Sequence, residues 1–109
     1  MQTSTELTIR NYHIDHFGHV NHARYVEFLE EARWQYLERN QLLEPIHRLE
    51  AFHVVSEINI EYRRPAILGE VLRIDTSIDG RWRNGFRVVQ NGYVKTSGKT
   101  VVKAVITNR

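Results

Sequence analysis

The stretch HARYVEFLEEARWQYLERN, residues 22–40, decides how the rest of the chain must fold. It contains neither glycine nor proline, and Asn21 stands before it as a helix N-cap. At about 100° per residue its apolar side chains share about a third of the circumference, and the acidic ones point away. The apolar set is Tyr25, Phe28, Leu29, Ala32 and Tyr36, and the acidic set is Glu27, Glu30, Glu31 and Glu38. This pattern predicts one amphipathic helix of roughly 25 Å.

Around this helix, five stretches alternate in the manner of strands. One precedes it, residues 6–14, and four follow a polar connection at 40–50: residues 52–66, 70–78, 86–95 and 99–107. In the second strand the expected apolar face is Phe52, Val54, Ile58, Ile60 and Tyr62. Asp-Gly and Asn-Gly pairs within 79–85 and the TSG at 96–98 indicate short turns, hence antiparallel neighbours.

This order of elements predicts an α+β domain spanning 1–109, with an antiparallel sheet of about five strands and one helix on one of its faces. The other face carries Val55, Val89 and Tyr93. We therefore expect a second subunit, most simply related by twofold symmetry.

Composition indicates a folded globular protein of one domain. The 109 residues are 41% apolar and 26% charged, and no cysteine is present, which excludes disulfides and thiolate chemistry. No basic start leads into an apolar run, and nowhere do about 18 apolar residues follow one another. We expect a cytoplasmic protein without membrane insertion.

Charge is unevenly distributed along the chain. Residues 1–61 carry 5 Lys and Arg against 10 Asp and Glu, whereas residues 62–109 carry 10 against 3. The overall balance is too small for a dedicated nucleic-acid binder, but the basic half suits a few phosphates on a small ligand. Arg63 and Arg64 are the preferred pair for that role, and Lys95 is a further candidate.

The segment YHIDHFGHVNHARY, residues 12–25, places His13, His16, His19 and His22 three residues apart. A metal site would need one regular element to give this spacing a geometric meaning, but Gly18 and the cap at Asn21 interrupt it. No serine lies in a G-x-S-x-G elbow either. We expect neither a metal site nor a Ser-His-Asp arrangement.

The carboxylate of Asp15 is the more informative group in this segment. It precedes the start of the long helix, where free N–H groups and the helix dipole stabilise negative charge. A carbonyl between the two would meet a base or nucleophile on one side and oxyanion donors, each worth ~3 kcal/mol, on the other. The alternative is that Asp15 only fixes the turn or caps the helix.

Three motifs carry a resemblance to a known family: the D-x-x-G-H-V-N run from Asp15 to Asn21, FLEEAR at 28–33 and YRRPA at 62–66. With Tyr12, Ala23, Arg24 and Tyr25, they resemble the 4-hydroxybenzoyl-CoA thioesterase-like branch of the hotdog-fold acyl-CoA thioesterases. Within it, the likeness is greatest to bacterial long-chain acyl-CoA thioesterases. This resemblance implies a curved antiparallel sheet wrapped around one long helix, with dimers or tetramers binding acyl-CoA between subunits.

The resemblance implies a hydrolase of fatty acid metabolism that cleaves acyl-CoA to free acid and CoA without a cofactor. Asp15 matches the catalytic aspartate of the family, as general base or nucleophile, and the backbone amide of His22 or its neighbours matches the oxyanion donor. We expect His19 and Asn21 to shape the loop and orient Asp15, and Tyr25 to border the acyl group. The alternative is a hotdog domain that binds acyl-CoA or acyl-carrier protein without turning it over.

Overall fold

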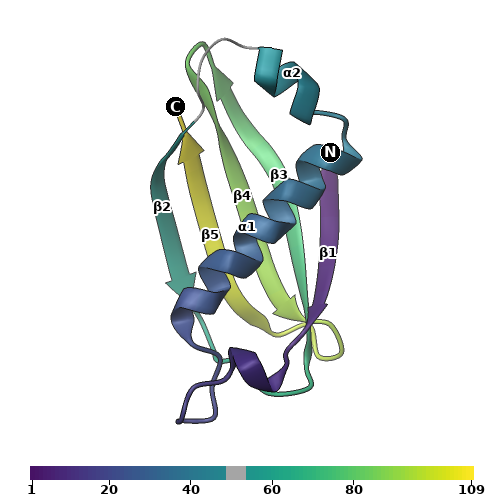
Figure 1. The fold of residues 1–109 in the computed structure, drawn as a ribbon, viewed down its shortest axis with the longest axis vertical. Helices are drawn as coiled ribbons and strands as arrows, with labels where there is room; N and C mark the ends of the chain where they lie inside the picture. Colours follow the sequence, from purple (N-terminus) through teal and green to yellow (C-terminus); the bar gives the residue numbers. More distant parts are fainter. Residues whose placement is uncertain (49–53) are drawn as a thin grey trace.

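The computed structural model describes residues 1–48 and 54–109, which form one sheet, one long helix and two short helices. Figure 1 shows the long helix α1 lying diagonally across one face of the sheet. The strands are β1 (Gln2–Thr8), β2 (Val55–Tyr62), β3 (Val71–Trp82), β4 (Gly85–Val94) and β5 (Thr100–Asn108). The helices are η1 (Asn11–His13), a single 3₁₀ turn, then α1 (His22–Arg39) and α2 (Leu43–Arg48).

The sheet has the order β1-β3-β4-β5-β2, and every neighbouring pair is antiparallel. β1 and β2 form its two edges (Figure 1). Between them, β3, β4 and β5 direct buried side chains such as Leu72, Val88 and Ile106 into a core shared with α1. The predicted α+β hotdog architecture is confirmed.

Helix α1 buries the face that the sequence predicts. Its buried residues are Tyr25, Phe28, Leu29, Ala32 and Tyr36. At its start, the side chain of Asn21 accepts a hydrogen bond from the Ala23 N–H at 2.9 Å, as an N-cap does. Deeper along the helix, Gln90 of β4 joins the two layers by donating to the Leu29 carbonyl at 2.9 Å while accepting from Arg33 at 3.0 Å.

The first strand differs from its predicted limits of 6–14. It begins at Gln2 and ends at Thr8, and the residues after it form η1. The cause is local: the His13 ring accepts the Arg10 N–H, and the His13 N–H bonds to the Arg10 carbonyl. These short-range bonds satisfy groups that a strand would have presented to a neighbour, so alternation alone was misleading.

Two further predictions were wrong in detail. The connection at 40–50 contains α2, which is too short to show a helical period and has Pro45 in its first turn, where proline is tolerated. The Asp79-Gly80 pair is no turn; it lies in β3 at a register shift, and the β3–β4 hairpin turns only at Arg83 and Asn84. Such a shift is typical of a β-bulge, for which glycine is also suited.

The edge strand β2 is largely exposed. Ile60 is partly buried, whereas Val54, Ile58 and Tyr62, on the predicted apolar face, are exposed. Phe52, also assigned to that face, lies outside the described residues. The opposite edge is partly covered, because Arg39 at the end of α1 donates to the Ser4 carbonyl of β1 at 2.7 Å.

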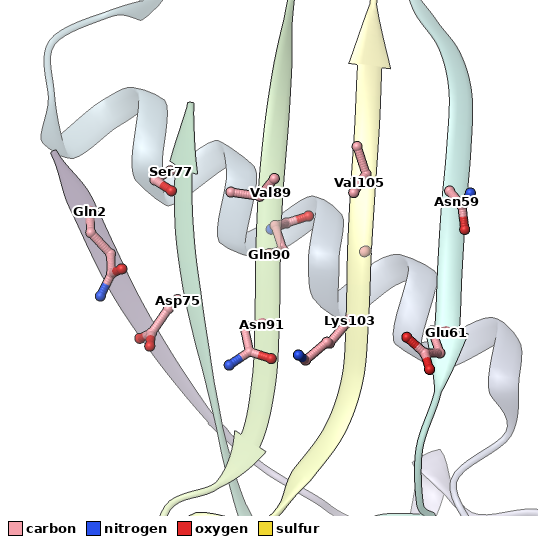
Figure 2. A pocket seen from close by; sticks show the side chains of 11 residues that line it. Gln2, Asn59, Glu61, Asp75, Ser77, Val89, Gln90, Asn91, Lys103 and Val105 are labelled. Carbon is pink, nitrogen blue, oxygen red and sulfur yellow. The ribbon is translucent and has the colours of Figure 1, made fainter. Parts of the chain in front are cut away.

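The sheet face away from α1 is more polar than Val55, Val89 and Tyr93 led us to expect. A pocket of about 440 Å³ lies on it. Figure 2 shows amide, carboxylate and ammonium groups from the strands around the two valines Val89 and Val105, with α1 behind the sheet. The polar side chains are Gln2, Asn59, Glu61, Asp75, Ser77, Asn91 and Lys103.

Candidate functional site

The loop between η1 and α1 holds Asp15 in a closed turn. Ile14 and Val20 form a β-bridge across the loop, and the Asp15 N–H donates to the His19 carbonyl at 2.9 Å. The Gly18 N–H donates to the Asp15 carbonyl at 3.1 Å, with Gly18 at φ +79°, a backbone conformation that favours glycine. The loop therefore fixes the backbone of Asp15 from both sides.

The Asp15 side chain is only partly committed to this turn. Its Oδ1 accepts the Phe17 N–H at 2.9 Å, as in an Asx turn. Its Oδ2 has no hydrogen-bond partner among the described residues. One carboxylate oxygen thus orients the group while the other stays available for chemistry.

The start of α1 leaves one amide open. Asn21 satisfies two of the first three helical N–H groups: its side chain accepts from Ala23, and its carbonyl accepts from Arg24, both at 2.9 Å. The His22 N–H, which is the first of the helix, has no acceptor within the described part of the chain. Of the amides predicted as oxyanion donors, the His22 N–H is the one that these capping bonds leave available.

Asp15 and His22 line the same open pocket, of about 410 Å³. Four other predicted residues, His19, Tyr25, Arg63 and Arg64, line it too. It therefore combines a carboxylate, the open end of a helix and two guanidinium groups. This arrangement can take a carbonyl oxygen near the start of the helix and an anion near the arginines.

Two tyrosines support the wall of this pocket. The buried Tyr25 hydroxyl accepts the Ala66 N–H at 2.9 Å, and burial raises the pKa of Tyr25, so the phenol stays neutral. Tyr62 donates to the His22 carbonyl at 3.2 Å, and its ring lies 5.6 Å from that of Tyr25. Tyr62 was not predicted as a site residue, although it begins the YRRPA motif, because its place on a strand face gave no sign that its hydroxyl would reach the helix.

The remaining predicted residues lie outside the pocket wall. The Asn21 side chain is engaged in capping α1, so it orders the site rather than lining it. Lys95, after β4, forms an ion pair with Glu6 at 3.1 Å and lies away from this pocket, so its assignment to the CoA phosphates stays a prediction. Its charge already has a partner in the same sheet.

The four regularly spaced histidines are not brought together. His13 is buried, whereas His16, His19 and His22 are exposed. Within residues 1–48 and 54–109 no group of three or more His, Asp or Glu side chains is placed to hold a metal ion. Nor is any helix in that part of the chain both long and apolar enough to cross a bilayer.

A five-stranded antiparallel sheet around one long helix is the hotdog fold, and here a carboxylate and the helix start line one pocket. The family model described as Thioesterase-like superfamily matches residues 9–108. The chain belongs to this superfamily.

Named relatives agree with this assignment. The chain is 39% identical over 103 residues to the long-chain acyl-CoA thioesterase FadM of Escherichia coli (strain K12), covering 94% of this chain and 78% of FadM. It is similar to the crystal structure of YbaW, a probable thioesterase from Escherichia coli, with 38% identity and a TM-score of 0.88 over 96% of this chain and 79% of YbaW. A Thermus thermophilus thioesterase complexed with coenzyme A and Zn has 26% identity and a TM-score of 0.81, over 96% and 75% of the respective chains.

Proposed function

We propose that this protein hydrolyses acyl-CoA thioesters, with Asp15 activating or performing the attack and the His22 N–H stabilising the oxyanion. The observation that carries the proposal is that one pocket presents a carboxylate oxygen and a helix N–H, neither of which has a hydrogen-bond partner among residues 1–48 and 54–109. FadM, a long-chain acyl-CoA thioesterase, supports the reaction and a long acyl chain. The Thermus relative, complexed with coenzyme A, supports the leaving group.

In the proposed reaction the thioester carbonyl lies between Asp15 and the start of α1. Either water, losing its proton to Asp15, or the Asp15 carboxylate itself adds to the carbonyl carbon. Negative charge develops on the carbonyl oxygen, which the His22 N–H and the helix dipole stabilise. The C–S bond then breaks and the electron pair leaves on the CoA thiolate. If Asp15 attacks, water hydrolyses the resulting anhydride in a second step.

We assign the CoA phosphates to the arginine end of the pocket. Arg63 already forms an ion pair with Glu61 at 2.8 Å. Arg64 lines the same pocket and forms no ion pair among the described residues, so its guanidinium is the more available of the two. Planar bidentate geometry suits arginine to phosphate oxygens.

Replacing Arg64 by glutamine is expected to raise KM for acyl-CoA about fivefold and leave kcat within about twofold, because phosphate binding acts far from the bond that breaks. The wild-type KM should also rise with salt, and more steeply than in Arg64→Gln. Steady-state kinetics at two ionic strengths measure both effects. Arg83→Gln, at the exposed β3–β4 hairpin, is the matched control and should behave as wild type. An unchanged KM in Arg64→Gln would contradict the assignment.

We also propose that the protein forms at least a homodimer through β2. Among the strands that the structure describes, β2 pairs with β5 alone, so its outer edge is open to a further strand and carries exposed apolar side chains. β2 ends at Tyr62 and leads directly into Arg63 and Arg64, and all three residues line the pocket, so a partner on this edge would border the site. A twofold axis beside β2 would continue the antiparallel sheet into the second copy. A cytoplasmic location stays a prediction.

An Ile58→Glu substitution is expected to convert the dimer to a monomer, because it places a charge among the exposed apolar side chains of β2 that pairing would bury. Light scattering after size-exclusion chromatography measures the mass. Val105→Glu is the control, since Val105 and Ile58 are similarly exposed, at 38% and 41%, but Val105 lies on the outer sheet face. A dimer that persists in Ile58→Glu would exclude the β2 interface.

A further inference from the structure

His13 is a buried titratable group, 9% exposed, that the proposed chemistry does not use. Its ring packs edge-on against Phe28 of α1, with centroids 4.9 Å apart, and against Tyr12 at 4.3 Å. Neither ring offers it a charge partner. A buried imidazole in such a place has a structural reason to be neutral.

His13 forms hydrogen bonds to residues on both sides of the loop that contains Asp15. Its Nδ1 accepts the Arg10 N–H at 2.9 Å, which closes η1. Its carbonyl accepts the Asn21 N–H at 3.1 Å, which fixes the residue that caps α1. Asp15 lies within the loop so closed, and His22 follows Asn21. The separation between the Asp15 carboxylate and the His22 N–H therefore depends on the position of His13.

We infer that neutral His13 is a positioning residue that holds Asp15 against the start of α1, and that its protonation switches hydrolysis off at acidic pH. The inference rests on the proposed roles of Asp15 and His22. Protonation removes the lone pair of Nδ1, so the ring can no longer accept the Arg10 N–H. A charged ring would also sit among aromatic side chains, and both effects expel it from its place against α1.

The surroundings of the ring favour the neutral form. Burial lowers the pKa of His13 from its ordinary value, and the nearby Arg24 and Arg10 lower this pKa further, whereas Glu27 raises it. Tyr12 and Phe28, which contact the ring, are uncharged aromatic groups. The folded protein binds this proton less tightly than the unfolded chain does. The contribution of neutral His13 to folding stability is therefore complete above about pH 6.5 and is lost as pH falls through the folded pKa.

The test is the pH profile of kcat for wild type, His13→Asn and the control His16→Asn, between about pH 5 and pH 8. Asparagine Oδ1 occupies the same bonded position as histidine Nδ1 and accepts the Arg10 N–H without titrating. We expect wild type and His16→Asn to lose activity together as the solution becomes acidic. His13→Asn should stay within about threefold of wild type at neutral pH, with its acid inflection displaced to lower pH.

Two further measurements keep the test decisive if His13→Asn folds poorly. His13→Phe keeps the ring but removes the acceptor, so kcat should fall at least about tenfold at every pH while KM changes less. In unaltered protein, the NMR shift of the Arg10 amide should change with the same midpoint as kcat. An acid inflection unchanged in His13→Asn, a wild-type kcat in His13→Phe, or an Arg10 amide that does not follow kcat would overturn the inference.

These outcomes are separable from failure of the proposed function. If Asp15→Asn abolishes hydrolysis while the acid inflection persists in His13→Asn, only the role of His13 is rejected. If Asp15→Asn remains fully active, the proposed chemistry is rejected first.

Discussion

Replacing Asp15 by asparagine is expected to lower kcat about a thousandfold while acyl-CoA still binds. Asparagine has the same shape, and its Oδ1 can keep the bond from the Phe17 N–H that orients the side chain. What the variant loses is the negative oxygen that takes a proton from water or attacks the carbonyl. Steady-state hydrolysis gives kcat, and calorimetric titration of acyl-CoA into the variant gives the affinity.

Glu31→Gln is the matched control for this experiment. It makes the same carboxylate-to-amide change on the exposed side of α1, where Glu31 accepts a hydrogen bond from Gln35 at 3.0 Å and does not line the site pocket. It should retain wild-type kcat. Full activity in Asp15→Asn would remove Asp15 from the chemistry, whereas wild-type protein that binds acyl-CoA without hydrolysing it would favour a binding domain.

His22→Pro is expected to reduce kcat about a hundredfold, because proline removes the one N–H proposed to meet the oxyanion. The position tolerates proline: it is the first residue of α1, where no helical hydrogen bond is lost. The preceding Asn21, at φ −59° and ψ 132°, already has the backbone conformation that a residue before proline requires. The substitution therefore tests an amide that side-chain changes leave intact.

His22→Ala separates the amide from the imidazole. It removes the ring, which lies 6.3 Å from that of Tyr62, but keeps the N–H, so kcat should stay within about threefold of wild type. Kinetics of both variants, with thermal unfolding to establish that each is folded, complete the comparison. An active His22→Pro, or an Ala variant as impaired as Pro, would refute the oxyanion role of the amide.

The features predicted best from the sequence are those that follow from the regular spacing of apolar residues. The helical stripe from Tyr25 to Tyr36 is buried as predicted, since every member faces a sheet that must cover it. The antiparallel order of the last three strands likewise follows from short connections. Both inferences needed only local spacing and the burial of apolar surface.

Features that depend on particular hydrogen bonds or on contacts between distant residues could not be predicted from spacing. The alternation at 6–14 did not reveal that the His13 ring would cap η1, and the charge of Lys95 did not reveal that Glu6 would neutralise it. Spacing indicated a donor at the start of α1, but only the bonds made by Asn21 single out the His22 amide. The spacing of the histidines raised the question of a metal site. In the structure, His13 instead packs against Phe28 and accepts the Arg10 N–H.

The most direct test of the central claim is release of free thiol from saturated acyl-CoA thioesters of increasing chain length, by wild type and Asp15→Asn at equal protein concentration. We expect one CoA and one free acid per thioester consumed, fastest with long chains, and a rate near background for the variant. Wild-type protein that releases no thiol at any chain length, or a variant that releases it at the wild-type rate, would contradict the account.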